Sequence, residues 1–242
     1  MTMLRTVLLV GLLAGLAAGL ATAVLQHFTT VPLIIAAEAY EASALPLDPS
    51  TAVAAHGHGS VEADGHAHDG AADAGWAPAD GLERTLSTTV ATMVSGIGFA
   101  LVLIAVMIVA DERITPTRAL AYAAAAFAAT GLAPALGLAP ELPGSAAGDL
   151  VARQVWWFAT AVATAAGLYA LLKLRTLPAS AIGVALIVAP HIVGAPQPDG
   201  YASTAPAELA AHFASTSLVV HATFWAFVGA AVGTVWQRVA RA

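Results

Sequence analysis

Residues 5–28 read RTVLLVGLLAGLAAGLATAVLQHF, an apolar run that carries no charged side chain after its first residue. About 20 such residues, coiled as an α-helix, cross the hydrocarbon core of a bilayer. A secretory signal peptide is the alternative, because Ala21 to Ala23 form an A-x-A cleavage pattern. The apolar core of a signal peptide extends over only about 7–15 residues. We therefore expect a retained transmembrane helix.

The rest of the chain has the same apolar character. Of its 242 residues, 59% are apolar and 10% are charged, and the mean hydropathy is +0.79. Soluble domains are about 25% charged, so most of this surface must face lipid. Cysteine is absent, which excludes disulfides and thiolate-bound metals. The single lysine, Lys173, belongs to no phosphate-binding glycine loop, and the net charge of −6 argues against nucleic-acid binding. We expect neither an enzyme nor a tightly bound cofactor.

Six apolar runs have the length and character of membrane spans. They are residues 4–27, 86–110, 118–138, 154–174, 179–195 and 213–236. The fifth is the shortest and holds Pro190 near its end, so the count falls to five if this segment does not cross. The sequence thus predicts an all-α, polytopic integral membrane helix bundle. It forms one membrane domain over residues 1–242, with a flexible extracytoplasmic loop, rich in His and acidic residues, at 42–82.

The basic residues predict the orientation, since cytoplasmic loops carry an excess of Lys and Arg. With both termini in the cytoplasm, only Arg84 and Arg153 fall outside. Of the 15 carboxylates, only Asp111 and Glu112 then fall inside. The outer face therefore concentrates the side chains that attract and bind cations.

Glycines recur at a spacing that favours close helix packing. Gly11, Gly15 and Gly19 form a doubled G-x-x-x-G pattern in the first run, and Gly229 and Gly233 repeat the spacing in the last. Such residues let transmembrane helices approach closely. We expect them to hold the bundle together.

The outer loop contains HGHGSVEADGHAHDG at residues 56–70, in which His56, His58, His66 and His68 form two H-x-H pairs. Neutral imidazole binds Zn, Ni, Co and Cu, and the neighbouring carboxylates raise the local concentration of cations. A flexible chain of this kind would bind with moderate affinity and poor selectivity. Three interpretations stay open: metal capture, a pH-sensitive spacer and a solvated linker.

A second candidate site lies around His191, in the segment APHIVGAPQP at residues 189–198. Prolines remove backbone donors, and the broken helices that result often mark binding sites in transporters. An ordinary helix end with an interfacial histidine is the alternative.

A third candidate is His221, about two turns inside the last span. An ionisable residue at that depth points to function, and a hydrogen bond to Ser217, one turn earlier, is the alternative. His212 lies on the opposite face of the same helix, so the two histidines cannot bind one ion on a straight helix.

Four short motifs, in order along the chain, resemble the CbtA family of predicted cobalt transporter subunits. After the glycine-rich first run come VPLIIAAEAYE at 31–41, GLAPELPG at 137–144, RQVWW at 153–157 and PHIVGAPQP at 190–198. The resemblance implies a multi-pass protein of the bacterial inner membrane that takes up cobalt for cobalamin synthesis. It also implies a partner, a small His-rich membrane subunit with one span (CbtB-like). Carried over to this chain, the resemblance implies functional roles for Glu38, Glu41, Glu141, His191 and Pro196.

We therefore expect uptake of a divalent transition metal, cobalt first, with nickel or zinc as alternatives. The loop histidines would capture the ion, and a site at the outer mouth would pass it on; this site would draw on His27, Glu38, Glu141, His191, His212 and His221. Two other functions stay open. One is a membrane haem protein with His27, His191, His212 and His221 as axial ligands, and the other is a metal buffer or sensor that does not transport. Association into a homo-oligomer is a further alternative.

Overall fold

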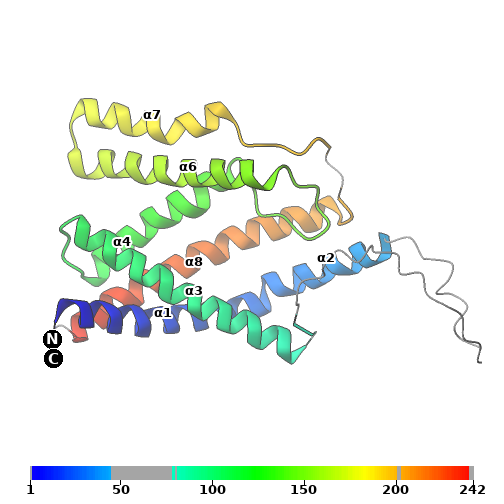
Figure 1. Ribbon diagram of the computed structural model, residues 1–242, viewed down its shortest axis with the longest axis horizontal. Coiled ribbons are helices and arrows are strands. Elements are labelled where there is room, and N and C mark those ends of the chain that lie inside the picture. The colour runs from blue at the N-terminus through cyan, green and yellow to red at the C-terminus, as the bar shows by residue number, and fades with distance from the viewer. Residues whose placement is uncertain (1, 45–77, 80, 201–202, 240–242) are drawn as a thin grey trace, which may run out of the picture.

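The computed structural model describes residues 2–44, 78–79, 81–200 and 203–239, and every regular element in them is helical (Figure 1). The chain begins with α1 (Met3–Phe28), α2 (Thr30–Ala44) and α3 (Leu82–Val109). Next comes α4 (Pro116–Phe127), which continues without a break through the π-helical segment η2 (Ala128–Leu132) into α5 (Ala133–Ala135). The last elements are α6 (Leu150–Tyr169) with its π-helical continuation η3 (Ala170–Leu174), α7 (Leu177–Val193) and α8 (Ala207–Val239).

Within the described residues, four helical segments are long and apolar enough to cross a membrane: α1, α3, α6 with η3, and α8. The predicted run at 179–195 lies in α7, which is apolar but only 17 residues long. The run at 118–138 lies in the helix formed by α4, η2 and α5. The all-helical membrane fold is therefore confirmed, and the crossing of these last two segments stays a prediction.

The turns that separate α4, α6 and α7 from the preceding elements have clear local causes. Thr115 and Thr176 each cap a helix whose first turn contains proline, and Asp149 accepts a hydrogen bond from the backbone N–H of Ala152 at 2.8 Å. These side chains satisfy N–H groups that have no partner within the helix. At the other end of the α6–η3 helix, Arg175 adopts a left-handed conformation with φ of 51°. The chain can thus reverse between η3 and α7.

Close approach at glycine joins neighbouring helices in three places. A Cβ on Gly15 of α1 would lie 2.7 Å from the carbonyl carbon of Gly96 in α3. A Cβ on Gly229 of α8 would lie 2.7 Å from the Cβ of Ala123 in α4. In the hairpin of α6 and α7, a Cβ on Gly167 would lie 2.6 Å from the carbonyl oxygen of Gly183. The packing role predicted for the glycines of the first and last runs is confirmed by these contacts.

The helices form two packed groups. The first, which we call the main bundle, consists of α1, α3, α4 and α8; these helices share a buried core that includes Val10, Ile104, Met107 and Val228. The second is the α6–α7 hairpin. Helix α7 packs on α6 and η3, and α6 reaches the main bundle through α4, η2 and α5. Figure 1 shows the hairpin as a layer beside the main bundle.

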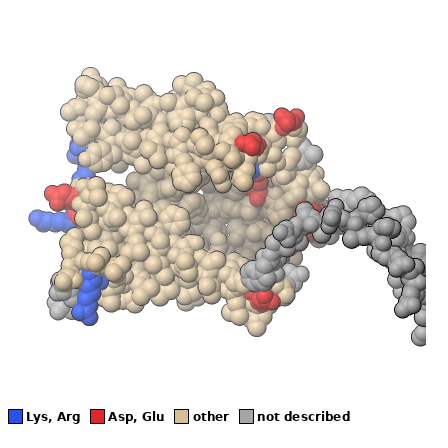
Figure 2. Space-filling view, viewed as in Figure 1, with Lys and Arg blue, Asp and Glu red and all other residues tan. Residues whose placement is uncertain are grey.

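The two ends of the molecule differ in charge. The start of α1, the end of α8 and the α3–α4 and α6–α7 turns lie at one end, which we call the basic end (Figure 1). Figure 2 shows Lys and Arg gathered there and most Asp and Glu side chains at the opposite, acidic end. This arrangement fits the predicted separation of charges.

Helix α2 was not predicted as an element. It lies at the acidic end (Figure 1), where Ala37 forms a small second core with Leu142 and Ala205. The segment after α5 and the segment before α8 meet beside it through a bridge between Ser145 and Ser203. Of the predicted loop at 42–82, residues 42–44 belong to α2 and Leu82 begins α3, and most of the rest lies outside the described residues.

Candidate functional site

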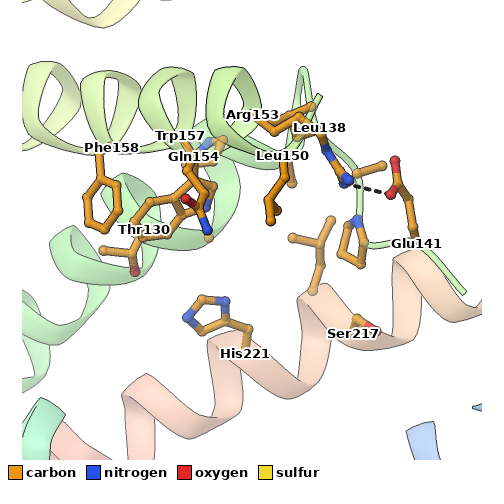
Figure 3. Close-up of a pocket in the computed structure, with 16 residues that line it drawn as sticks. Thr130, Leu138, Glu141, Leu150, Arg153, Gln154, Trp157, Phe158, Ser217 and His221 are labelled. Carbon is orange, nitrogen blue, oxygen red and sulfur yellow. Dashed lines mark hydrogen bonds and ion pairs between the residues drawn. The ribbon is translucent and has the colours of Figure 1, made fainter. Parts of the chain in front are cut away.

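A cavity of ≈ 490 Å³ lies between α8, the first half of α6 and the segment from η2 to the loop after α5 (Figure 3). Most of its wall is apolar. The polar side chains in the wall are Thr130, Glu141, Arg153, Gln154, Ser217 and His221. A concave, mainly apolar site with a few converging polar groups is the usual form of a binding site.

The π-helical segment shapes one wall of this cavity. Segments of this kind are rare and are frequent at functional sites. Gly131 lies in the segment, and a Cβ there would lie 3.0 Å from Nδ1 of His221 and 2.9 Å from Cδ2 of Phe127. Glycine at this position therefore leaves room for the imidazole, which packs against the ring of Phe127 at a centroid distance of 5.8 Å.

His221 points from α8 toward α6 and the cavity (Figure 3). Its Nε2 accepts a hydrogen bond of 3.1 Å from the indole N–H of Trp225, and the same N–H lies 3.2 Å from Oγ1 of Thr130. The predicted alternative partner was Ser217, which instead forms part of the cavity wall. A nitrogen that accepts a hydrogen bond requires the neutral imidazole with its proton on Nδ1. Neither ring nitrogen therefore offers a free lone pair to a metal ion in this arrangement.

Two of the carboxylates predicted as metal ligands, Glu38 and Glu141, bind arginines. At the cavity mouth Arg153 donates to Glu141 at 2.6 Å (Figure 3). On α2, Glu38 accepts two hydrogen bonds from the guanidinium of Arg84, at 2.5 and 2.8 Å. The hydrogen bonds from Arg84 hold the pKa of the Glu38 carboxyl below its usual value. The two arginines on the acidic end thus each neutralise a predicted metal ligand.

His191 lies on α7 outside the cavity. Its ring packs edge-on against Trp156 of α6 at a centroid distance of 5.9 Å. The indole of Trp156 donates to the carbonyl of Pro190 at 3.1 Å. Helix α7 continues through Pro190 and ends at Val193, and Gly194 follows with φ of 84°. The interruption predicted around His191 is therefore a helix end just beyond it.

The remaining predicted residues have separate surroundings. His27 is exposed at the end of α1, where its ring packs against Phe28. Glu41 on α2 and His212 on α8 are also exposed. His56, His58, His66 and His68 lie outside the described residues.

Among the residues that the structure describes, no three His, Cys, Asp or Glu side chains could together hold a metal ion. The outer-mouth site predicted from six residues is therefore not formed as one cluster. Of those six, His221 and Glu141 share the cavity. Sequence reasoning missed Thr130, Gln154 and Trp225, which carry no charge and lie on three different elements. The sequence ATGLAP at residues 129–134, in which Gly131 and Pro134 interrupt an alanine-rich run, could have indicated an irregular helix at this position.

Comparison with known protein families identifies the family of this chain. The family described as "Probable cobalt transporter subunit (CbtA)" matches residues 4–237. The chain belongs to the CbtA family. The comparison with curated proteins and the comparison with solved structures gave no match. Membership confirms the predicted resemblance, which covers nearly the whole chain. A CbtA protein is thus a probable subunit of a cobalt transporter, and with four apolar membrane-length helices this one is a multi-pass membrane protein.

Proposed function

We propose that this CbtA protein carries Co²⁺ inward across the bacterial inner membrane, with the basic end and both termini in the cytoplasm. The charge distribution supports this orientation. The basic end includes the α3–α4 and α6–α7 turns (Figure 2), and an excess of Lys and Arg is typical of cytoplasmic segments. The two arginines of the acidic end are neutralised by Glu38 and Glu141.

The observation that carries the proposal is the position of His221 in the cavity. The wall on the acidic side includes Glu141 and Arg153, and His221 lies deeper, on the α8 side (Figure 3). An ionisable residue within a membrane span is rare and usually functional. An ion that enters from the acidic end would meet the ion pair first and the imidazole next.

The geometry of His221 suggests how it would handle the ion. Because Trp225 occupies Nε2, a resting imidazole would hold Co²⁺ poorly. We propose that an arriving ion displaces the indole N–H and binds Nε2 for a short time. Weak, transient binding suits a pathway, since an ion held tightly would not leave.

Capture would precede this step. We propose that His56, His58, His66 and His68 collect the ion outside, and that Glu38, Glu41, His27, His191 and His212 add weak contacts around the mouth. Since the described residues form no three-ligand cluster, Co²⁺ would keep part of its water shell in the cavity. A partner subunit, His-rich and with a single span, would supply further ligands.

The membrane potential would drive the ion inward. Each elementary charge gains about 2.3 kcal/mol per 100 mV, so a divalent ion gains roughly 4–5 kcal/mol. No nucleotide-binding loop is present in the sequence, which agrees with a potential-driven step.

Uptake of radioactive cobalt by cells that express the chain with its partner tests the proposal. His221→Ala should abolish uptake, whereas Thr223→Ala should leave it unchanged. Thr223 is half-buried on the same helix, does not line the cavity and donates to the carbonyl of Val219, so it is a matched control. Equal uptake by both variants would show that the cavity histidine has no part in transport. A red, Soret-absorbing purified protein would favour the haem alternative instead.

A further inference from the structure

One carboxylate at the basic end connects the two helix groups. Glu112, in the turn between α3 and α4, binds Arg118 of α4 and also Lys173 of η3. The Glu112 side chain is 11% exposed, whereas that of Lys173 is 33% exposed. The hydrogen bond from Lys173, followed by that from Arg118, lowers the pKa of Glu112. The carboxylate is therefore charged at neutral pH and holds two cations.

These contacts span the gap between the main bundle and the hairpin. Arg118 belongs to the main bundle, and Lys173 ends the long helix of the hairpin. Between α6 and the main bundle, packing concentrates at η2 and α5, about the middle of the molecule (Figure 1). The cavity with His221 opens on the acidic side of that packing. Figure 2 shows the two layers separated by a hollow, with charged side chains at the basic end of the separation.

We propose that Glu112, Arg118 and Lys173 form the inner gate of the cavity, which closes the cytoplasmic end while the outer end is open. The inference rests on the proposed function, because a gate has meaning only if an ion passes. The hairpin would pivot on its contact with η2 and α5. When Lys173 leaves Glu112, the basic end would open and the cavity would reach the cytoplasm.

A cation that binds Glu112 would open the gate. A divalent ion that leaves His221 would compete with Lys173 for the Glu112 carboxylate. The Lys173 side chain is 33% exposed, so water can solvate its ammonium group when it leaves Glu112. Partly solvated ion pairs of flexible side chains contribute little to stability, and the gate can therefore open and close within a transport cycle. Arg118, held in the same helix group as Glu112, would keep the carboxylate oriented while Lys173 moves.

The absence of cysteine makes a direct test available, since a single introduced thiol is the only one in the chain. Ser217→Cys places that thiol in the cavity wall. The protein is reconstituted in vesicles, and a membrane-impermeant maleimide is added on the cytoplasmic side or on the outer side. Labelling from the cytoplasmic side then reports whether the inner end is open, with no need for cobalt.

In the Ser217→Cys background, Glu112→Gln and Lys173→Met should speed cytoplasmic labelling at least tenfold, with labelling from the outer side no faster than in the parent protein. Lys173→Arg keeps the cation and should stay protected. Asp111→Asn removes the same charge one residue earlier in the turn and should also stay protected. Equal cytoplasmic rates in Glu112→Gln and Asp111→Asn would overturn the gate. Faster labelling from both sides would also overturn it, because it indicates general loosening.

The same variants separate the gate from the proposed function. If cytoplasmic labelling responds as expected while no variant or parent protein takes up radioactive cobalt, the ion pair closes the basic end of the cavity, but the cobalt transport proposal fails. If cobalt uptake occurs but labelling does not respond, the gate is wrong and the transport proposal survives.

Discussion

Two glycines of α3 that lie two residues apart should respond oppositely to alanine. A Cβ on Gly96 would lie 3.1 Å from both Cα and the backbone nitrogen of Gly19 and still closer to the carbonyl oxygen of Gly15, both in α1. A Cβ on Gly98 would have no atom within 4 Å. The chemical change is the same, and the two sites share a helix. Only the contact with α1 differs.

The expected magnitudes follow from this difference. Replacing glycine by alanine inside a helix gains about 0.5–1 kcal/mol, because glycine loses more backbone entropy on folding. Gly98→Ala should show this gain. At Gly96 the added methyl group must push α1 away, and overpacking of this kind costs about 1–3 kcal/mol. The net change for Gly96→Ala is then a loss of up to roughly 2.5 kcal/mol.

The assay is thermal unfolding of the purified protein in detergent, followed by the fluorescence of its five tryptophans. In a chain of this size 1 kcal/mol shifts Tm by about 2–4 °C. Gly96→Ala should therefore lower Tm, by up to roughly 10 °C, and Gly98→Ala should raise it by roughly 1–4 °C. Equal shifts for the two variants would refute the reasoning, since α1 and α3 would then not meet through Gly96.

The other predictions concern charge, the cavity and the loop. Because Arg84 lowers the pKa of Glu38, their ion pair should add stability at neutral pH that is lost as the pH falls through this lowered pKa. Glu38→Gln should remove that acid-side fall in Tm, and an unchanged pH profile would contradict the pairing. Trp225→Phe should free Nε2 of His221 and tighten Co²⁺ binding measured by titration calorimetry; unchanged affinity would mean that the indole does not withhold the nitrogen. Alanine at all four histidines of residues 56–68 should raise the cobalt concentration for half-maximal uptake, with the maximal rate kept. A lost maximal rate would instead make the loop part of the pathway.

The membrane character and the helix packing could be predicted from the sequence because both depend on local patterns. An apolar run of sufficient length predicts a span wherever it occurs. The four-residue spacing of glycines around Gly15 is enough to predict close helix packing, although the residue that it contacts, Gly96, lies in another helix. Charge separation along the chain likewise predicted which turns lie at the basic end.

The site could not be predicted to the same degree, because its contacts join residues far apart in the chain. Glu38 and Arg84 are separated by 46 positions, and no local pattern shows that they meet. The bond from Trp225 to His221 spans one helical turn, but Ser217 lies one turn away on the other side, so spacing alone did not identify the partner. Helix α2 is only 15 residues long and contains Glu38 and Glu41, so length and hydropathy do not predict a span there. Its position depends on Leu142 and Ala205 from distant segments.

The most direct test of cobalt transport is uptake of radioactive cobalt into liposomes that contain the purified protein with its partner subunit. An imposed potential, negative inside, should drive Co²⁺ into these liposomes well above protein-free liposomes, and His221→Ala should remove the excess. Uptake equal to that of protein-free liposomes at every potential would contradict the account.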